Sequence, residues 1–194
     1  MATSPSRRPF DFSANHVVLD FVNTVNGRPT YSRDDLAVID DVLDWAFAAG
    51  IAQLPCGEIE PSQLRQVVAL RESLYGVFGP IAHGEAPLPA ALAVVTRRAA
   101  RAMRSSAWAR SETGFQPSWQ RNSIDGLCDR LADDAVQLLR SDGINRIGSC
   151  AGCGWLFLDV SRAHARRWCS MNACGVRSKM RRYHQRQMTA TSDL

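Results

Sequence analysis

Four cysteines in the C-terminal part of the chain have the spacing of a metal site. Two residues separate Cys150 from Cys153, four separate Cys169 from Cys174, and fifteen lie between the two pairs. Two close cysteine pairs joined by a short segment can place four thiolates around a tetrahedral zinc ion. Because four thiolates leave no position open for a water molecule, we expect one structural Zn²⁺ and no catalytic metal.

The same cysteines could instead form disulfide bonds, which would require an oxidising compartment. Residues 6–10, Ser-Arg-Arg-Pro-Phe, resemble a twin-arginine export signal. However, Asp11, Asn15 and Asp20 interrupt the apolar stretch that such a signal needs. The sequence also lacks an apolar run of about eighteen residues, so we expect a cytoplasmic protein without a membrane partner. In a reducing compartment, metal binding is the favoured use of the cysteines.

The positive charge of the chain is concentrated beside these cysteines. Residues 1–149 contain 15 arginines and 17 acidic residues, whereas residues 150–194 contain 8 basic and 2 acidic residues. With 45% hydrophobic and 22% charged residues, the whole chain has a globular composition. A compact basic segment is typical of a surface that binds a polyanion, because binding releases counterions.

The residues around the cysteines predict a small zinc finger at 144–188. Residues 155–160 are aromatic and apolar like a strand, 161–165 would form a turn, and 166–168 would return as the second strand. Residues 175–186 have a helical composition. A knuckle (the turn at 150–154 that carries the first cysteine pair), a β-hairpin and a helix therefore follow one another in a treble-clef-like order. So small a module has little core, and zinc binding, worth roughly 10–16 kcal/mol in finger peptides, would hold it together.

The predicted C-terminal helix separates apolar from basic residues. Val176, Met180 and Tyr183 share one side at about 100° per residue, and we expect this stripe to pack on the hairpin. The basic residues of the helix and the hairpin are the candidate DNA contacts: Arg162, Arg166, Arg167, Arg177, Lys179, Arg181, Arg182 and Arg186. Binding of duplex DNA is the favoured interpretation, and RNA binding or protein docking through the same surface are the alternatives.

Hydrophobic periodicity predicts a mainly α-helical domain at 15–143, so that the whole chain is α+β with a majority of helix. We expect tails at 1–14 and 189–194. We expect a short helix within 16–25, with a strand as the alternative, then a helix capped by Ser32 and closed by Gly50, and a longer helix beginning at Pro61. A helix over 88–104 should follow, with Leu92, Val95, Ala99 and Met103 facing inward. A β-hairpin within 105–121 and a helix between Ser123 and Asp142 complete the domain.

Polar residues around the end of the first predicted helix form a second candidate site. Asp20, Asn23, Thr24, Asn26 and Arg28 could line a pocket for a small effector, or could serve in helix capping and the turn that follows. The sequence shows no nucleophile–base set, phosphate-binding loop or open metal position. We therefore expect a binding protein and not an enzyme.

The C-terminal segment resembles the CGNR-type zinc finger of bacteria. Beyond the cysteine frame, the resemblance rests on residues 156–159, 161–162, 167–171 and 174–179. Upstream, residues 19–25, Leu-Asp-Phe-Val-Asn-Thr-Val, are similar to the opening of the ABATE-type domain that commonly precedes this finger.

This resemblance implies a stress-related transcriptional regulator whose finger binds DNA and whose N-terminal domain senses an effector. A homodimer is a further partner to consider. The chain departs from the family pattern at Val176, where the motif that names the finger has asparagine. Because Val176 falls on the apolar stripe, the fold should tolerate this change, but a polar contact to DNA at the position would be lost.

Overall fold

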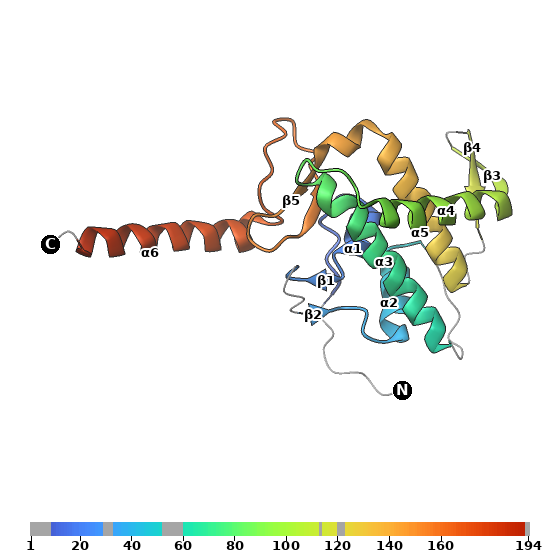
Figure 1. Ribbon diagram of the computed structural model, residues 1–194, viewed down its shortest axis with the longest axis horizontal. Coiled ribbons are helices and arrows are strands. Elements are labelled where there is room, and N and C mark those ends of the chain that lie inside the picture. Colours follow the sequence, from blue (N-terminus) through green and yellow to red (C-terminus); the bar gives the residue numbers. More distant parts are fainter. Residues whose placement is uncertain (1–8, 29–32, 52–59, 113, 120–122, 193–194) are drawn as a thin grey trace.

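The computed structural model describes residues 9–28, 33–51, 60–112, 114–119 and 123–192 (Figure 1). The helices are α1 Val17–Val22, α2 Ile39–Ala48, α3 Pro61–Ile81, α4 Pro89–Ser105, α5 Ile124–Arg140 and α6 Val176–Ser192, with a 3₁₀ turn η1 Asp142–Arg146 and a π turn η2 Met171–Gly175. The strands are β1 Val25–Asn26, β2 Arg33–Asp34, β3 Ala107–Ser111, β4 Gly114–Ser118, β5 Ile147–Ser149 and β6 Leu156–Leu158.

The expected mainly helical fold is confirmed, and its core forms around the short helix α1. Val18, Leu19, Phe21 and Val22 are fully buried, because α1 is covered by α3, α5 and strand β6. Helix α5 packs against α4 and carries a continuous buried stripe. It begins at Ile124, where the Ser123 hydroxyl accepts a hydrogen bond from the Gly126 N–H at 3.0 Å.

Helix α2 begins later than the sequence pattern predicts. Ser32 lies outside the described residues, and Arg33 and Asp34 form strand β2, which pairs with β1. The Asp34 carboxylate is engaged by Arg71 at 2.6 Å and by the Leu36 N–H, so it does not enter a helical turn. The helix is capped instead by Asp41, whose carboxylate accepts the Val38 N–H at 2.9 Å.

Helix α4 presents a different inward residue from the one expected near its end. Val95 and Ala99 are buried as predicted, but Ala102 is fully buried whereas Met103 is 40% exposed. Ala102, three residues after Ala99, lies on the same buried face of the helix, whereas the side chain of Met103 is rotated away from that face. The β-hairpin expected after α4 is confirmed as β3 and β4, which pair antiparallel.

The two expected tails are partly structured. Residues 1–8 and 193–194 lie outside the described residues. Ala14 is fully buried, and the Phe12 ring lies 6.3 Å from the ring of Trp45, so residues near the N-terminus already pack on the domain. At the other end, α6 continues to Ser192.

The finger contains a β-hairpin, but its strands differ from the predicted ones. Strand β6 pairs antiparallel with β5, and the first cysteine pair lies in the turn between them. Residues 166–168 are not a strand, so the prediction of a second strand there is wrong. None of the described helices is both long and apolar enough to cross a membrane.

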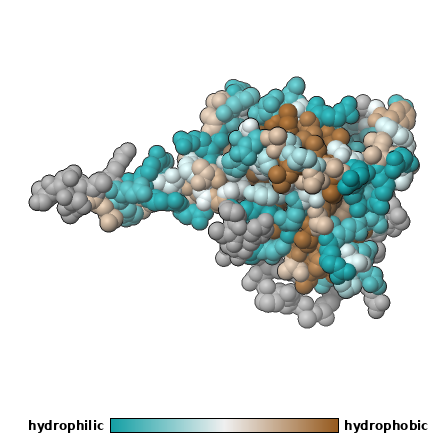
Figure 2. Space-filling model, viewed as in Figure 1, coloured by the Kyte–Doolittle hydropathy of each residue, from teal (hydrophilic) through white to brown (hydrophobic). Residues whose placement is uncertain are grey.

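Helix α6 extends away from the rest of the molecule (Figure 1). Val176, Met180 and Tyr183 are 47%, 53% and 57% exposed. The expectation that this stripe packs on the hairpin is therefore wrong: the hairpin buries its apolar side against α1 instead. Figure 2 shows mainly hydrophilic residues along the visible face of α6.

Candidate metal centre and nucleic-acid interface

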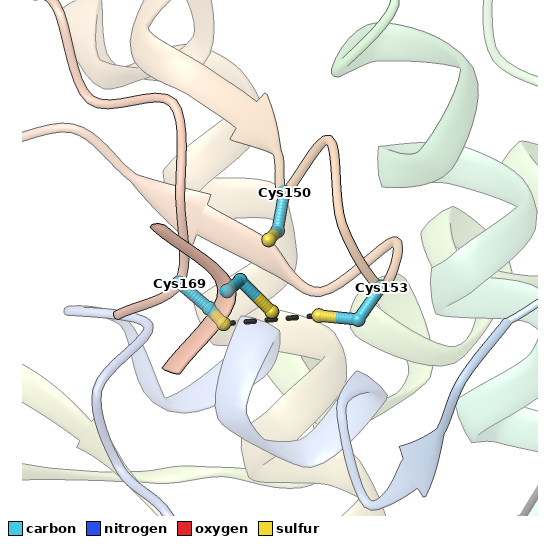
Figure 3. Close-up of side chains that lie close together, drawn as sticks. Cys150, Cys153 and Cys169 are labelled. Carbon is cyan, nitrogen blue, oxygen red and sulfur yellow. Dashed lines mark hydrogen bonds between the residues drawn. The ribbon is translucent and has the colours of Figure 1, made fainter. Parts of the chain in front are cut away.

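The four predicted zinc ligands come together from separate parts of the finger. Cys150 directly follows β5, Cys153 lies in the turn before β6, Cys169 precedes η2, and Cys174 lies within η2. Figure 3 shows the side chains of Cys150, Cys153 and Cys169 pointing toward a common centre. The ligand atoms of all four residues lie within 4.8 Å of one another.

The geometry fits a tetrahedral zinc site. With Zn–S bonds of about 2.3 Å, tetrahedral coordination separates neighbouring sulfur atoms by about 3.8 Å. The Sγ atoms of Cys153 and Cys169 are 3.7 Å apart, which matches this separation and is much longer than a disulfide bond of about 2.05 Å. The four cysteines therefore form a closed site for one Zn²⁺, which holds the finger together and offers no open position for catalysis.

Donors near the sulfur atoms offset the negative charge of the thiolates. The Gly152 N–H points at the Cys150 sulfur at 3.5 Å, and the Arg177 guanidinium donates to the Cys174 sulfur at 3.1 Å. In the metal-free site, the hydrogen bond with Cys169 lowers the pKa of Cys153 to about 5, while the same pairing raises the pKa of Cys169. The cluster thus retains protons that zinc must displace, so zinc binding weakens as the pH falls.

Arg166 is a structural residue of the finger. Its guanidinium donates to the carbonyl groups of Trp168, Cys169 and Ser13 at 3.1, 2.8 and 3.0 Å. It also lies 4.3 Å above the ring of Phe157, which is buried in the small core beside the cysteines. Arg166 therefore positions the loop that carries Cys169, and its predicted contact with DNA stays a prediction.

The side chain of Asn23, at the end of α1, bonds directly to strand β6 of the finger. The Asn23 carboxamide donates to the Leu156 carbonyl at 2.8 Å and accepts the Leu156 N–H at 2.9 Å. Asn23 thus bonds strand β6 in the way a neighbouring strand would. A main-chain bond from the Leu158 N–H to the Ala14 carbonyl at 2.8 Å continues the contact. The residues that the sequence suggested for an effector pocket therefore include one that joins the two parts of the chain.

Close packing also fixes the knuckle against the N-terminal domain. Gly154 has φ of +72°, and a Cβ atom built on it would lie 2.6 Å from the Arg28 carbonyl oxygen. Only glycine accommodates both the left-handed backbone and this approach. The turn that carries Cys153 consequently rests directly on the segment after β1.

The other candidate effector residues have structural partners. The Asp20 carboxylate accepts the Ala14 N–H at 2.9 Å, and the Thr24 hydroxyl donates to the Phe21 carbonyl at 2.7 Å. Asn26 donates to Asp35 at 2.8 Å, and Arg28 forms an ion pair with Glu72. The five residues are close together in sequence, but in the part of the chain that the structure describes each is held by its own structural partner.

Asn26 and Arg28 do border an open cleft beside the zinc site. The cleft has a volume of about 690 Å³, and its finger side is formed by Cys153, Trp155 and Arg177 among others. Asp20, Asn23 and Thr24 are buried in the domain interior, with exposures of 6%, 3% and 4%. An effector role for the five residues stays a prediction.

The basic residues expected to contact DNA differ in their surroundings. Arg162, Lys179, Arg181 and Arg182 are exposed, and the structure shows no ion pair for them within the described part of the chain. Arg167 is exposed beside the Trp168 ring at 5.9 Å, and Arg177 contacts Cys174. The side chain of Arg186 is outside the described residues.

The structural roles of three residues were not predicted from the sequence: Arg166, which was assigned only to DNA contact, Arg71 in the N-terminal domain, and Asn15. Arg71 is buried and bonds Asp34, Glu72 and Thr24. Asn15, with φ of +64°, donates to the Leu158 carbonyl at 3.0 Å. An arginine within the apolar stripe of α3 was the one available signal, because a buried cation requires acidic partners.

Comparison with known protein families covers both parts of the chain. The model of the ABATE family, described as "putative stress-induced transcription regulator", matches residues 15–142. The model of the CGNR zinc finger matches residues 146–187, which include all four zinc ligands. No curated protein matches the chain. The cysteine site and the two matches together show that the chain belongs to the ABATE family and carries a CGNR zinc finger at its C-terminal end.

Proposed function

We propose that this protein is a transcription regulator that binds duplex DNA through α6 and through the adjacent loop at 161–168, which carries Arg162, Arg166 and Arg167, without catalysing a reaction. One observation carries the proposal: a helix with basic residues and no acidic residue projects from the zinc site into solvent (Figure 1). The zinc ion fixes the start of α6, because its ligand Cys174 lies only two residues before the first residue of that helix.

The dimensions and charge of α6 suit a nucleic-acid groove. An α-helix with its side chains is about 10–12 Å across, and the major groove of B-DNA is about 12 Å wide. On one side of the exposed stripe lie Arg177 and Arg181, and on the other lie Lys179 and Arg182. A helix that carries cations on both flanks can contact the phosphates of both strands.

Paired substitutions test this proposal. Arg181→Ala with Arg182→Ala removes two exposed cations from α6, whereas Arg97→Ala with Arg104→Ala removes two exposed cations from α4. We expect the α6 variant to bind a duplex roughly 10-fold or more weakly at low salt and the α4 variant to bind like wild type. Fluorescence anisotropy with a labelled duplex measures both. Equal affinities for the two variants, or no binding by wild type, would overturn the proposal.

Protein docking through α6 is the second candidate function. The exposure of Val176, Met180 and Tyr183 favours it, because a helix that contacts only phosphates has no need of an apolar stripe. Met180→Gln separates the two functions, since it leaves every cation in place. Unchanged duplex affinity in this variant supports DNA binding, whereas loss of a nuclease-resistant protein complex would favour docking.

Control by a small effector in the N-terminal domain is an additional part of the proposal. It is supported by the direct bonding between α1 and the finger, through which a change in the domain would reach β6. A hollow of about 670 Å³ between the N-terminal segment and α2, lined by Phe10, Phe12 and Phe47, offers room for a ligand. A compound that raises the melting temperature of wild type but not of Phe12→Ala would identify this hollow as the site.

A further inference from the structure

The four zinc ligands are not equally accessible. Cys150 and Cys174 are each 2% exposed, whereas Cys153 and Cys169 are only partly buried. Cys153, Cys169 and Cys174 all border the open cleft of about 690 Å³ between the finger and the N-terminal domain, but only Cys153 and Cys169 combine this position with a partly exposed side chain. A small reagent in solvent therefore reaches Cys153 and Cys169 first.

The two accessible sulfur atoms are also close enough to react with each other. Their distance of 3.7 Å must shrink by less than about 2 Å to reach the length of a disulfide bond. Cys153 lies in a turn held by the bond from its N–H to the Cys150 carbonyl at 3.2 Å. Cys169 lies in the segment between β6 and η2, where Arg166 holds its carbonyl group at 2.8 Å, so the two sulfur atoms approach each other by rotation of the side chains and not by a shift of the main chain.

We propose that Cys153 and Cys169 form a redox switch in which a small two-electron oxidant converts the zinc-bound pair into a disulfide. With hypochlorous acid, one thiolate attacks chlorine and hydroxide leaves. The second thiolate then attacks that sulfur and chloride leaves. Two thiolates thus lose two electrons, the oxidant becomes chloride and hydroxide, and Zn²⁺ departs because only two thiolates remain to hold it.

The loss of zinc changes the part of the molecule that carries α6. Cys174 loses the metal that ties η2 to the β5–β6 turn, so the direction of α6 is no longer fixed. If α6 binds DNA as proposed above, oxidation also releases the DNA. The switch itself rests on the zinc site alone, so its test does not depend on DNA.

The test uses the zinc-loaded full chain with Cys56→Ser, which removes a thiol outside the described residues. Hypochlorite is added at one equivalent, zinc release is followed with a chromogenic chelator, and disulfides are mapped by mass spectrometry. We expect about one zinc released per chain, a Cys153–Cys169 disulfide, and recovery of zinc binding after reduction with dithiothreitol. Cys128 is fully buried, and burial raises the pKa of its thiol to about 12, so it serves as the internal control that stays reduced.

A second variant keeps the test decisive. Cys169→His retains a nitrogen ligand for zinc but has no sulfur to form the disulfide. We expect zinc release from this variant to be roughly 10-fold slower at the same dose of oxidant. Retained zinc in the parent protein, a disulfide that involves Cys150 or Cys174, or equal release rates in the two proteins would overturn the proposal.

Discussion

The Asn23 carboxamide forms hydrogen bonds with both the N–H and the carbonyl group of Leu156. Both residues are buried, so none of these polar groups is exposed to solvent. Asn23→Ala leaves the Leu156 N–H and carbonyl without these partners. We expect a loss of about 2–3 kcal/mol in the free energy of unfolding, because two buried polar groups become unsatisfied. Urea denaturation measures the loss, with Asn172→Ala, an exposed position in η2, as the matched control. Equal stability of the two variants would show that Asn23 does not join the finger to α1.

Asp20 makes the stability depend on pH in the opposite sense from an ion-paired aspartate. Burial raises its pKa from 3.8 to about 6, against the opposing hydrogen bond from the Ala14 N–H. Between about pH 4 and 6 the folded state therefore holds a proton that the unfolded chain has released, and stability falls as the pH rises.

Asp20→Asn keeps an oxygen that can accept the Ala14 N–H and removes the titration. From pH 4 to 7 we expect wild type to lose up to about 3 kcal/mol of stability relative to this variant. His16 and Asp134 have shifted pKa values as well, but both proteins share them, so their contributions cancel in the comparison. A difference that does not change with pH would contradict the buried-carboxylate account.

At the scale of elements, the turn between β5 and β6 depends on one glycine. In Gly154→Ala, the new residue would adopt a strained left-handed backbone, and its Cβ atom would also clash with the Arg28 carbonyl oxygen. In Gly50→Ala, the backbone has a similar φ of +68°, but no atom lies within 4 Å of the new Cβ. We expect Gly50→Ala to cost about 1 kcal/mol and Gly154→Ala about 1–3 kcal/mol more. Thermal unfolding measures both costs. Similar costs would mean that the turn does not rest on the N-terminal domain.

Helix α6 should gain order when it meets a polyanion. The pairs Arg177/Arg181 and Arg182/Arg186 place like charges four residues apart, and α6 projects from the rest of the molecule, so tertiary packing adds little to its stability. We expect duplex DNA to increase the ellipticity at 222 nm, with a smaller increase for the Arg181→Ala, Arg182→Ala variant. No increase in wild type would indicate that α6 is already fully formed or does not bind.

Local patterns in the sequence predict most elements, and contacts between distant residues account for the rest. The zinc ligands and the helices follow from spacings of a few residues, which is why both were predicted. The role of Asn23 depends on a strand 133 residues away, and no local pattern reports such a partner. Strand β5 has only three residues, too few to show the alternation of apolar and polar residues that predicts a strand, so its pairing with β6 was not predicted. The stripe on α6 has helical spacing, but spacing does not show whether a partner surface exists.

At the scale of the whole molecule, the hairpin of the finger belongs to the main hydrophobic core of the N-terminal domain, whereas a second small core surrounds the cysteines. Ile147 and Leu156, which belong to the hairpin of the finger, pack in the same cluster as Leu19 and Phe78. Zinc removal by a chelator should therefore lower the melting temperature of the whole chain by several degrees and not melt the finger alone. Differential scanning calorimetry with and without chelator makes the comparison. An unchanged main transition in the zinc-free protein would show that the two parts are independent.

The salt dependence of DNA binding tests the central claim most directly. For the zinc-loaded protein, the logarithm of the association constant is plotted against the logarithm of the salt concentration. If α6 and the adjacent loop contact phosphates, we expect a slope of about −3 or steeper in wild type, reduced by about 2 in Arg181→Ala with Arg182→Ala. The same slope in wild type and in this variant would contradict the account, because α6 would then not be the part of the molecule that meets DNA.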